Sequence, residues 1–176
     1  GHSDVVAGAL AAAAEDELWA KARESRSLDG VILGPFEAWL VLRGMRTMHL
    51  RVQQSCASAM HIASHFSAHP KIERVLYPGL ADHPGHEIAK RQMRGGYGGM
   101  MSIQVAGGRD AALRVAKAVQ LFIPATSLGG VESLLEHRAT VEGPDSPVPD
   151  NLLRISVGIE DVGDLVADLE QALTQA

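Results

Sequence analysis

Residues 44–69 read GMRTMHLRVQQSCASAMHIASHFSAH, a stretch that contains no proline. Its apolar and small side chains recur every three or four residues, at Met48, Val52, Ser55, Cys56, Ala59, Ile62, Ala63 and Phe66. This spacing predicts one long amphipathic helix, which His69-Pro70 would end. At 1.5 Å per residue the helix would be about 35 Å long, roughly a domain's width, so we expect it to link two domains.

Beyond Pro70 the pattern changes to short strands separated by helices. Residues 72–77, 100–105 and 153–157 are predicted strands, and residues 109–121 and 161–172 are predicted helices. Consecutive strands are too close in places for the long connections that parallel pairing needs. The predicted fold class is therefore α/β, with a small, mainly antiparallel sheet flanked by helices and a proline-containing surface loop at residues 142–150.

Before the long helix the sequence predicts two shorter helices and one buried segment. Residues 15–27 are charged and favour a helix, and Gly34-Pro35 would open a second one, with proline in the first turn. Val5–Leu10 lacks polar alternation, so we expect either a strand buried on both faces or a piece of buried helix.

Composition and charge exclude several classes of function. The chain has 176 residues, 46% hydrophobic and 21% charged, and a net charge of −5, with no basic stripe for nucleic acid. The longest apolar run, residues 5–14, is too short to span a membrane. The single cysteine, Cys56, excludes an intrachain disulfide, and a reducing, cytoplasmic location fits best.

The familiar motifs of metal and hydrolase sites are missing. His61 and His65 are four residues apart, but the HExxH frame of a zinc site is absent, so we predict no metal. No Gly-x-Ser-x-Gly elbow occurs, and the glycine clusters at residues 95–99 and 129–130 match no phosphate-binding loop. Turns are the better interpretation of those glycines.

Arg154 is the most distinctive charged residue. It lies between Leu153 and Ile155 on a predicted strand, so its side chain should point away from the core. Such an arginine can bind a ligand's carboxylate through two nitrogens, or it can pair with a neighbouring Asp or Glu. From the residues alone the second interpretation is favoured.

Seven stretches, spread over the whole chain, resemble a known family in their order and sequence. They are GHSDV (1–5), LRGMRT (42–47), VLYPGL (75–80), HPGHE (83–87), GGM (98–100), SLGGVES (127–133) and RISVGIE (154–160). Together they resemble the Cys/Met transsulfuration family of pyridoxal-phosphate enzymes, which includes cystathionine gamma-synthase and gamma-lyase.

The resemblance implies the C-terminal part of a fold-type I transferase. Residues 1–45 would be a remnant of the large cofactor-binding domain, and residues 46–176 a C-terminal α/β domain that begins with the long helix. In the family the Schiff-base lysine would lie just upstream of Gly1. The chain is thus expected to hold no cofactor-binding residue of its own for pyridoxal 5'-phosphate and to be inactive alone.

The resemblance also implies roles for four residues. Ser127 matches a serine that helps to orient the catalytic lysine, and Arg154 matches the arginine that binds the substrate α-carboxylate, which reverses the preference stated above. Thr126 replaces a glutamate that many gamma-synthases and gamma-lyases carry for the distal amino group of cystathionine. Beta-lyases often have an aromatic residue in place of Leu128, so Leu128 favours the gamma class.

The implied function is gamma-replacement or beta- or gamma-elimination on a small-molecule substrate, a sulfur amino acid or a homoserine ester. The intact enzyme would be a homo-oligomer, a tetramer in this family. A different class of function stays open at this point: a stand-alone, non-catalytic C-terminal domain that serves as a binding or assembly module.

Overall fold

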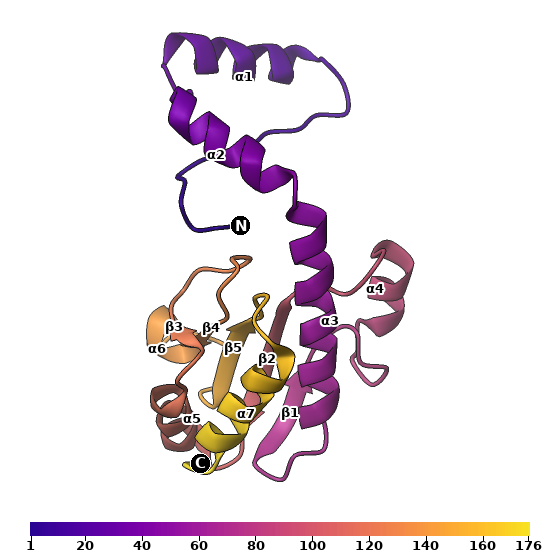
Figure 1. Ribbon diagram of the computed structural model, residues 1–176, viewed down its shortest axis with the longest axis vertical. Coiled ribbons are helices and arrows are strands. Elements are labelled where there is room, and N and C mark those ends of the chain that lie inside the picture. The colour runs from indigo at the N-terminus through magenta and orange to yellow at the C-terminus, as the bar shows by residue number, and fades with distance from the viewer. The chain divides into compact units, whose positions relative to one another are not determined.

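The computed structural model describes residues 1–176 and divides them into two compact units (Figure 1). One unit comprises residues 2–48, and the other comprises residues 49–176 together with residue 1. The first unit contains helices α1 (Glu17–Leu28) and α2 (Pro35–Met45). Asp16 caps α1 by accepting a hydrogen bond from the Trp19 N–H, and Pro35 begins α2, as predicted.

Neither α1 nor α2 buries a side chain completely. Several large apolar side chains of the two helices are more than half exposed, namely Leu18, Leu28, Phe36, Trp39 and Leu42. Monomeric soluble proteins rarely expose so many large apolar residues close together. This unit therefore lacks a hydrophobic core of its own.

The prediction for Val5–Leu10 was wrong for this structure, since the segment forms neither a strand nor a helix. Val6 is 99% exposed and Leu10 is 78% exposed. A strand needs a neighbour to satisfy its backbone N–H and C=O groups, and all strands of the sheet come from residues beyond Pro70. Apolar composition alone could not supply that neighbour.

The long helix is shorter than predicted. Helix α3 covers Met48–Phe66, and a turn at Arg46 and Thr47 separates it from α2. Gly44 and the β-branched Thr47 are both poor helix formers, and the Thr47 N–H bonds to the Gly44 carbonyl at 3.3 Å, three residues back. No helix of the chain combines the length and the hydropathy that crossing a bilayer requires.

The second unit is built on a five-stranded sheet in the order β1-β2-β5-β4-β3. The strands are β1 (Ile72–Leu76), β2 (Met100–Val105), β3 (Ile123–Pro124), β4 (Leu134–His137) and β5 (Leu152–Ser156). Only the β3–β4 pair is parallel, which confirms the α/β class and the mainly antiparallel sheet. The sequence prediction missed β3 and β4, which are too short to show a period.

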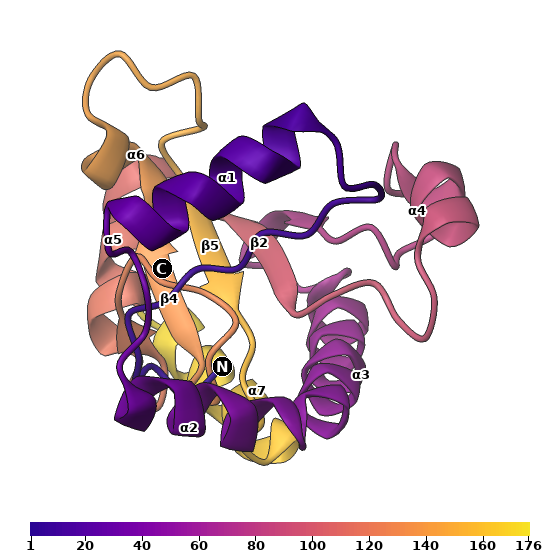
Figure 2. The same ribbon diagram turned by 90° about the horizontal axis from the view of Figure 1, so that it is seen from above.

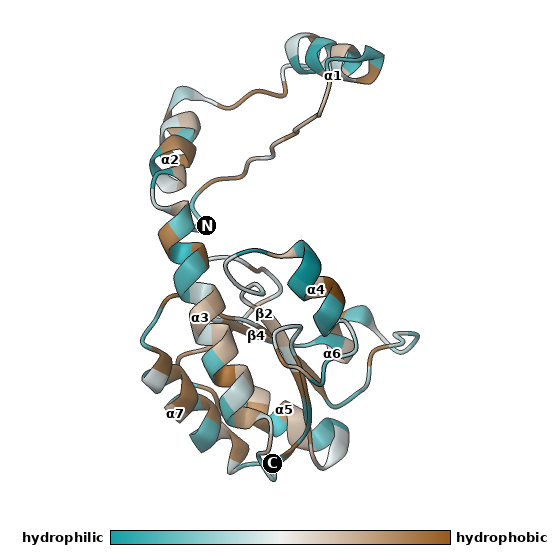
Figure 3. Cartoon of the chain, turned by 90° about the vertical axis from the view of Figure 1, so that its right-hand side faces the viewer, coloured by the Kyte–Doolittle hydropathy of each residue, from teal (hydrophilic) through white to brown (hydrophobic).

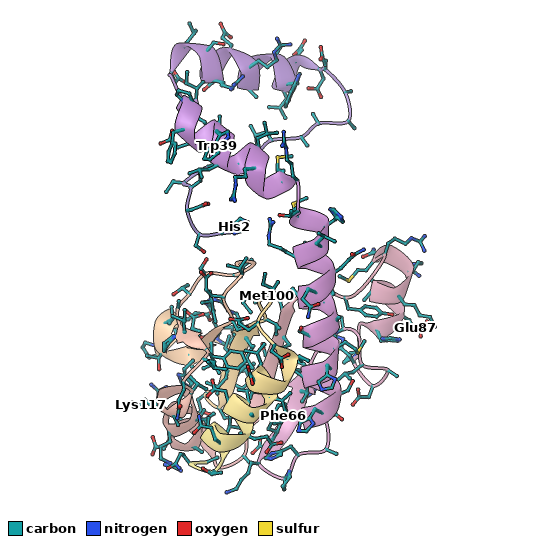
Figure 4. All side chains as sticks on the ribbon, in the orientation of Figure 1. His2, Trp39, Phe66, Glu87, Met100 and Lys117 are labelled. Atoms are coloured by element: carbon teal, nitrogen blue, oxygen red, sulfur yellow. The ribbon has the colours of Figure 1, made fainter.

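Three helices cover one face of this sheet, namely α3, α5 (Gly108–Ala118) and α7 (Val162–Leu173). In the view from above, α3 and α7 lie on the same side of β2 and β5 (Figure 2). Phe66 at the end of α3 is fully buried in their common core (Figure 4). The predicted helices at residues 109–121 and 161–172 are confirmed, although α5 ends earlier, at Ala118.

Two short helices were not predicted, α4 (His86–Gln92) and α6 (Arg138–Glu142). Helix α4 buries no residue and is largely hydrophilic (Figure 3). A helix of this length shows fewer than two full turns of periodicity, so its sequence carries little signal. The loop predicted at residues 142–150 has no strand and only the last residue of α6.

The buried Asp168 on α7 holds the segment that follows α5. Its carboxylate accepts the backbone N–H groups of Gln120 and Leu121, both at 2.8 Å, and that of Phe122 at 3.2 Å. Burial raises the pKa of Asp168, but these hydrogen bonds together with one from Gln171 outweigh it, and the net pKa is lowered. The ionised carboxylate thus stabilises the entry to β3.

We expect Asp168→Asn to lower the free energy of unfolding by about 2 kcal/mol at pH 7, because a buried acceptor of several N–H groups loses its charge. A lowered folded-state pKa contributes stability above the unfolded-state value of about 3.9, and this stability is lost as pH falls through the folded value. Urea unfolding of wild type and variant should therefore converge in acid. Asp145→Asn, in the exposed loop, is the control and should change stability by less than about 0.5 kcal/mol. A loss of stability that stays constant from neutral to acid pH would contradict this account.

Candidate functional site

Arg154 lies on the sheet face opposite the three covering helices. It belongs to β5, the central strand, where its neighbours Leu153 and Ile155 are fully buried in the core. Successive side chains of a strand point to opposite faces, so Arg154 must point away from that core, as predicted. On this face it lies beside Ser102 of β2 and Glu136 of β4, its register partners.

One nitrogen of Arg154 makes all of its contacts. Nη2 lies 3.0 Å from Glu136 Oε2, donates closely to the Thr126 carbonyl and lies 3.3 Å from the Ser127 carbonyl. The pairing with an acidic neighbour, which the residues alone favoured, is therefore present. Nη1 and Nε form no hydrogen bond with protein atoms, so they can donate to an anion such as a carboxylate.

Several hydrogen bonds join the segment that carries Thr126 and Ser127 to the end of β5 and to the residues that follow it. The Gly129 N–H donates to Ser156 Oγ at 3.0 Å, and the Ile159 N–H donates to the Val131 carbonyl at 2.9 Å. The Ser133 hydroxyl accepts from the Gly158 N–H and donates to Glu160, both at 2.8 Å. The stretches at residues 127–133 and 154–160 thus form one connected structure around Arg154.

Gly158 allows these two stretches to approach closely. A Cβ atom there would lie 2.1 Å from the Val131 carbonyl oxygen and 2.7 Å from the Glu132 carbonyl carbon. Both are backbone atoms that cannot rotate away. Only glycine fits at this position without moving the Ser127 segment relative to β5.

A third stretch, at residues 98–100, meets the same strand end from the other side. The Val157 N–H donates to the Gly99 carbonyl at 2.8 Å, and Ser55 Oγ on α3 donates to the Val157 carbonyl at 2.7 Å. A Cβ atom on Gly99 would lie 2.0 Å from Ser55 Oγ. Helix α3 and β2 therefore fix the position of β5, and with it Arg154.

The structure brings three of the four sequence-predicted site residues together. Thr126 and Ser127 contact Arg154 through their backbone carbonyls, and both side chains are exposed. The Ser127 hydroxyl forms no hydrogen bond with protein atoms, and Leu128 is 58% exposed. The side chains of Thr126, Ser127 and Leu128 thus remain accessible to a ligand.

Sequence reasoning missed Glu136 and Arg138. Glu136 is 6% exposed, and its Oε2 lies 3.0 Å from Arg138 Nη1, while Arg138 also holds Glu142 through Nε at 3.0 Å. The pKa of Arg138 is raised, mainly by its hydrogen bond to Glu136 and secondly by its hydrogen bond to Glu142. The pKa of Glu142 is lowered, mainly by the hydrogen bond from the Ser146 hydroxyl and secondly by the one from Arg138. The alternation of acidic and basic residues at 136, 138 and 142 was the available signal.

The lysines of this unit are engaged or placed elsewhere. Lys71 donates to the carbonyl of Ala176 at 2.9 Å, and Lys90 is exposed, 4.0 Å from Glu87 on α4. Lys117 is exposed on α5 (Figure 4). None of the three contacts Arg154 or the loop at Thr126.

Comparison with known proteins decides the family. Residues 1–174 match the family described as Cys/Met metabolism PLP-dependent enzyme. The chain belongs to this family. Over 98% of its length it is 49% identical to cystathionine gamma-synthase of Mycobacterium tuberculosis and 45% identical to cystathionine gamma-lyase of Dictyostelium discoideum.

The fold is also similar to that of a solved structure. The structure of cystathionine gamma-lyase from yeast aligns with 99% of this chain, with a TM-score of 0.90 and 42% sequence identity. The match covers 47% of the yeast chain, and the two curated relatives are covered to 45% and 46%. The chain thus spans about half the length of the relatives that it matches.

The close contact at Gly158 makes a sharp test of this site geometry. We expect Gly158→Ala to lower the free energy of unfolding by about 3 kcal/mol, because a methyl group would press on two backbone atoms. Gly8→Ala is the control, since a Cβ atom there meets nothing within 4 Å. It should change stability by less than about 0.5 kcal/mol in the same urea titration. Equal effects of the two substitutions would show that the two stretches are not in contact.

Proposed function

We propose that this chain supplies the substrate-carboxylate site of a pyridoxal-phosphate transsulfuration enzyme. The enzyme would act on a sulfur amino acid or a homoserine ester by gamma-replacement or by beta- or gamma-elimination, most like cystathionine gamma-synthase or gamma-lyase. The observation that carries the proposal is Arg154, held on the sheet face opposite α3, α5 and α7, with Nη1 and Nε free of hydrogen bonds to protein atoms. Membership of the Cys/Met metabolism family supplies the reaction class.

The remainder of the enzyme would complete the cofactor site. We assign residues 1–45 to a large cofactor-binding domain of fold type I and residues 46–176 to the C-terminal domain. The exposed apolar side chains of α1 and α2 support this assignment, because they need a surface to cover them. For the intact protein we propose a cytoplasmic homotetramer.

The residues of this chain do not fit the cofactor itself. Pyridoxal phosphate needs an amine for its aldehyde, but the three lysines of the α/β unit lie away from Arg154, and the fourth, Lys21, is exposed on α1. We therefore place the Schiff-base lysine outside these 176 residues and propose that the chain alone does not turn over substrate. When bound, the cofactor supplies an electron sink for the pair left at Cα.

Each proposed site residue has a role that its position allows. Arg154 binds the α-carboxylate and so helps to set which bond at Cα is aligned for cleavage. Ser127 offers a free hydroxyl beside that carboxylate, which can orient the amine that moves the α-proton. Thr126 and Leu128, both exposed, would contact the more distal part of the substrate.

The role of Arg154 can be tested in the full-length protein. We expect Arg154→Leu to reduce kcat/KM by at least about 100-fold, by raising KM and lowering kcat together, because both binding and alignment depend on the guanidinium. Substrates to assay are L-cystathionine, L-methionine and O-succinyl-L-homoserine. Arg114→Leu is the matched control, since Arg114 donates only to the carbonyl of Gln175, on the helix-covered side. Unchanged kinetics for Arg154→Leu would refute the proposed site.

The proposed location of the lysine can be tested by reductive trapping. After incubation with pyridoxal phosphate and sodium borohydride, the full-length protein should carry one cofactor on a lysine outside these 176 residues. The 176-residue chain alone should show only trace labelling, the same at all four of its lysines. Peptide mass spectrometry locates the adduct, with reduction in the absence of cofactor as the control. Stoichiometric labelling of Lys21, Lys71, Lys90 or Lys117 would contradict the proposal. Turnover of substrate by the 176-residue chain alone would also contradict it.

A further inference from the structure

Two arginines share one oxygen of a buried carboxylate beside the proposed substrate site. Glu136 Oε2 lies 3.0 Å from Arg154 Nη2 and 3.0 Å from Arg138 Nη1. The other oxygen, Oε1, is buried and has no hydrogen-bond partner. Glu136 therefore makes both of its ion pairs through one oxygen atom, Oε2, which contacts the two arginines.

The geometry of Arg154 makes this sharing important for ligand binding. A guanidinium can bind a carboxylate through two nitrogens along either of two edges, one formed by Nε and Nη2 and the other by Nη1 and Nη2. Both edges include Nη2, which already faces Glu136 and the carbonyls of Thr126 and Ser127. Nη2 has only two hydrogens, so a substrate carboxylate bound at two points must displace one of these acceptors.

Arg138 is placed to make that displacement easy. If Arg154 left Glu136 without another cation, a buried carboxylate would stay uncompensated, which is strongly unfavourable. Arg138 already holds the same oxygen, and its own position is fixed by Glu142, which accepts from Nε at 3.0 Å and from Nη2. Ser146 in turn donates to Glu142, so the loop after α6 supports the arrangement.

We propose that Arg138 is a positioning residue that keeps Glu136 neutralised while Arg154 turns its Nη2 to the substrate carboxylate. This inference rests on the proposed function, because it assumes that Arg154 binds that carboxylate. Glu136 holds Arg154 in place before the substrate arrives, and Arg138 takes over the carboxylate when the substrate binds. No bond is formed or broken, and the charge on Glu136 is balanced throughout.

The test is a double-mutant cycle in the full-length protein, with kcat and KM measured on its best substrate among those named above. Arg138→Met should raise KM about tenfold and leave kcat within about twofold, because it affects the release of Arg154 and not the later chemistry. In the Glu136→Gln background the same substitution should change KM by less than about twofold, since no buried charge is left to balance. Arg138→Lys keeps the positive charge and should recover most of the loss in KM.

Two further measurements separate positioning from a structural role. Calorimetric titration with L-alanine, an amino acid that has a carboxylate and no leaving group, should show the same rise in the dissociation constant for Arg138→Met. Arg109→Met, which removes only a hydrogen bond to Thr140 of α6, should leave both constants unchanged.

The outcomes distinguish this inference from the proposed function. If Arg154→Leu raises KM but Arg138→Met does not, the inference is wrong and the proposed function stands. If Arg138→Met raises KM by the same factor in the wild type and in the Glu136→Gln variant, Arg138 acts by supporting α6 and its loop. That result would also overturn the inference. If Arg154→Leu has no effect, the proposed function itself fails.

Discussion

The alternation of side chains along β5 is the constraint on which the rest of the structure depends. This strand lies at the centre of the sheet, and its buried residues Leu153 and Ile155 are held against α3, α5 and α7. A shift of register by one residue would bring a guanidinium into the apolar core and expose these two side chains. The same packing that stabilises the fold therefore directs Arg154 to the face opposite these helices.

Close backbone approach at the end of β5 then builds the surroundings of this arginine. Gly158 and Gly99 leave no room for a side chain, and Ser133, Ser55 and Glu160 satisfy the polar groups there. The result is a loop whose two carbonyls, from Thr126 and Ser127, face the guanidinium. The contacts that hold the end of β5 in place are thus the same ones that position the loop around Arg154. A substitution that weakens these contacts should therefore affect both the fold and the site.

The sequence predicted the larger elements because they repeat a period. Helices α5 and α7 and strands β1, β2 and β5 follow their apolar patterns, and the direction of Arg154 follows from its place in β5. Strands β3 and β4 are too short for a period, so Glu136 was not placed beside Arg154. Val5–Leu10 failed for a different reason, since a strand needs a partner that no residue pattern within the segment can supply. The roles of Ser127, Thr126 and Leu128 stay predictions.

The central claim is that Arg154 receives the carboxylate of an amino-acid substrate. The most direct measurement is a crystal structure of the full-length protein with a bound amino acid. We expect the α-carboxylate to contact two nitrogens of Arg154 at about 2.7–2.9 Å, with Glu136 still paired to Arg138. A carboxylate bound elsewhere, with Arg154 Nη2 unchanged against Glu136 and the carbonyls of Thr126 and Ser127, would contradict the account.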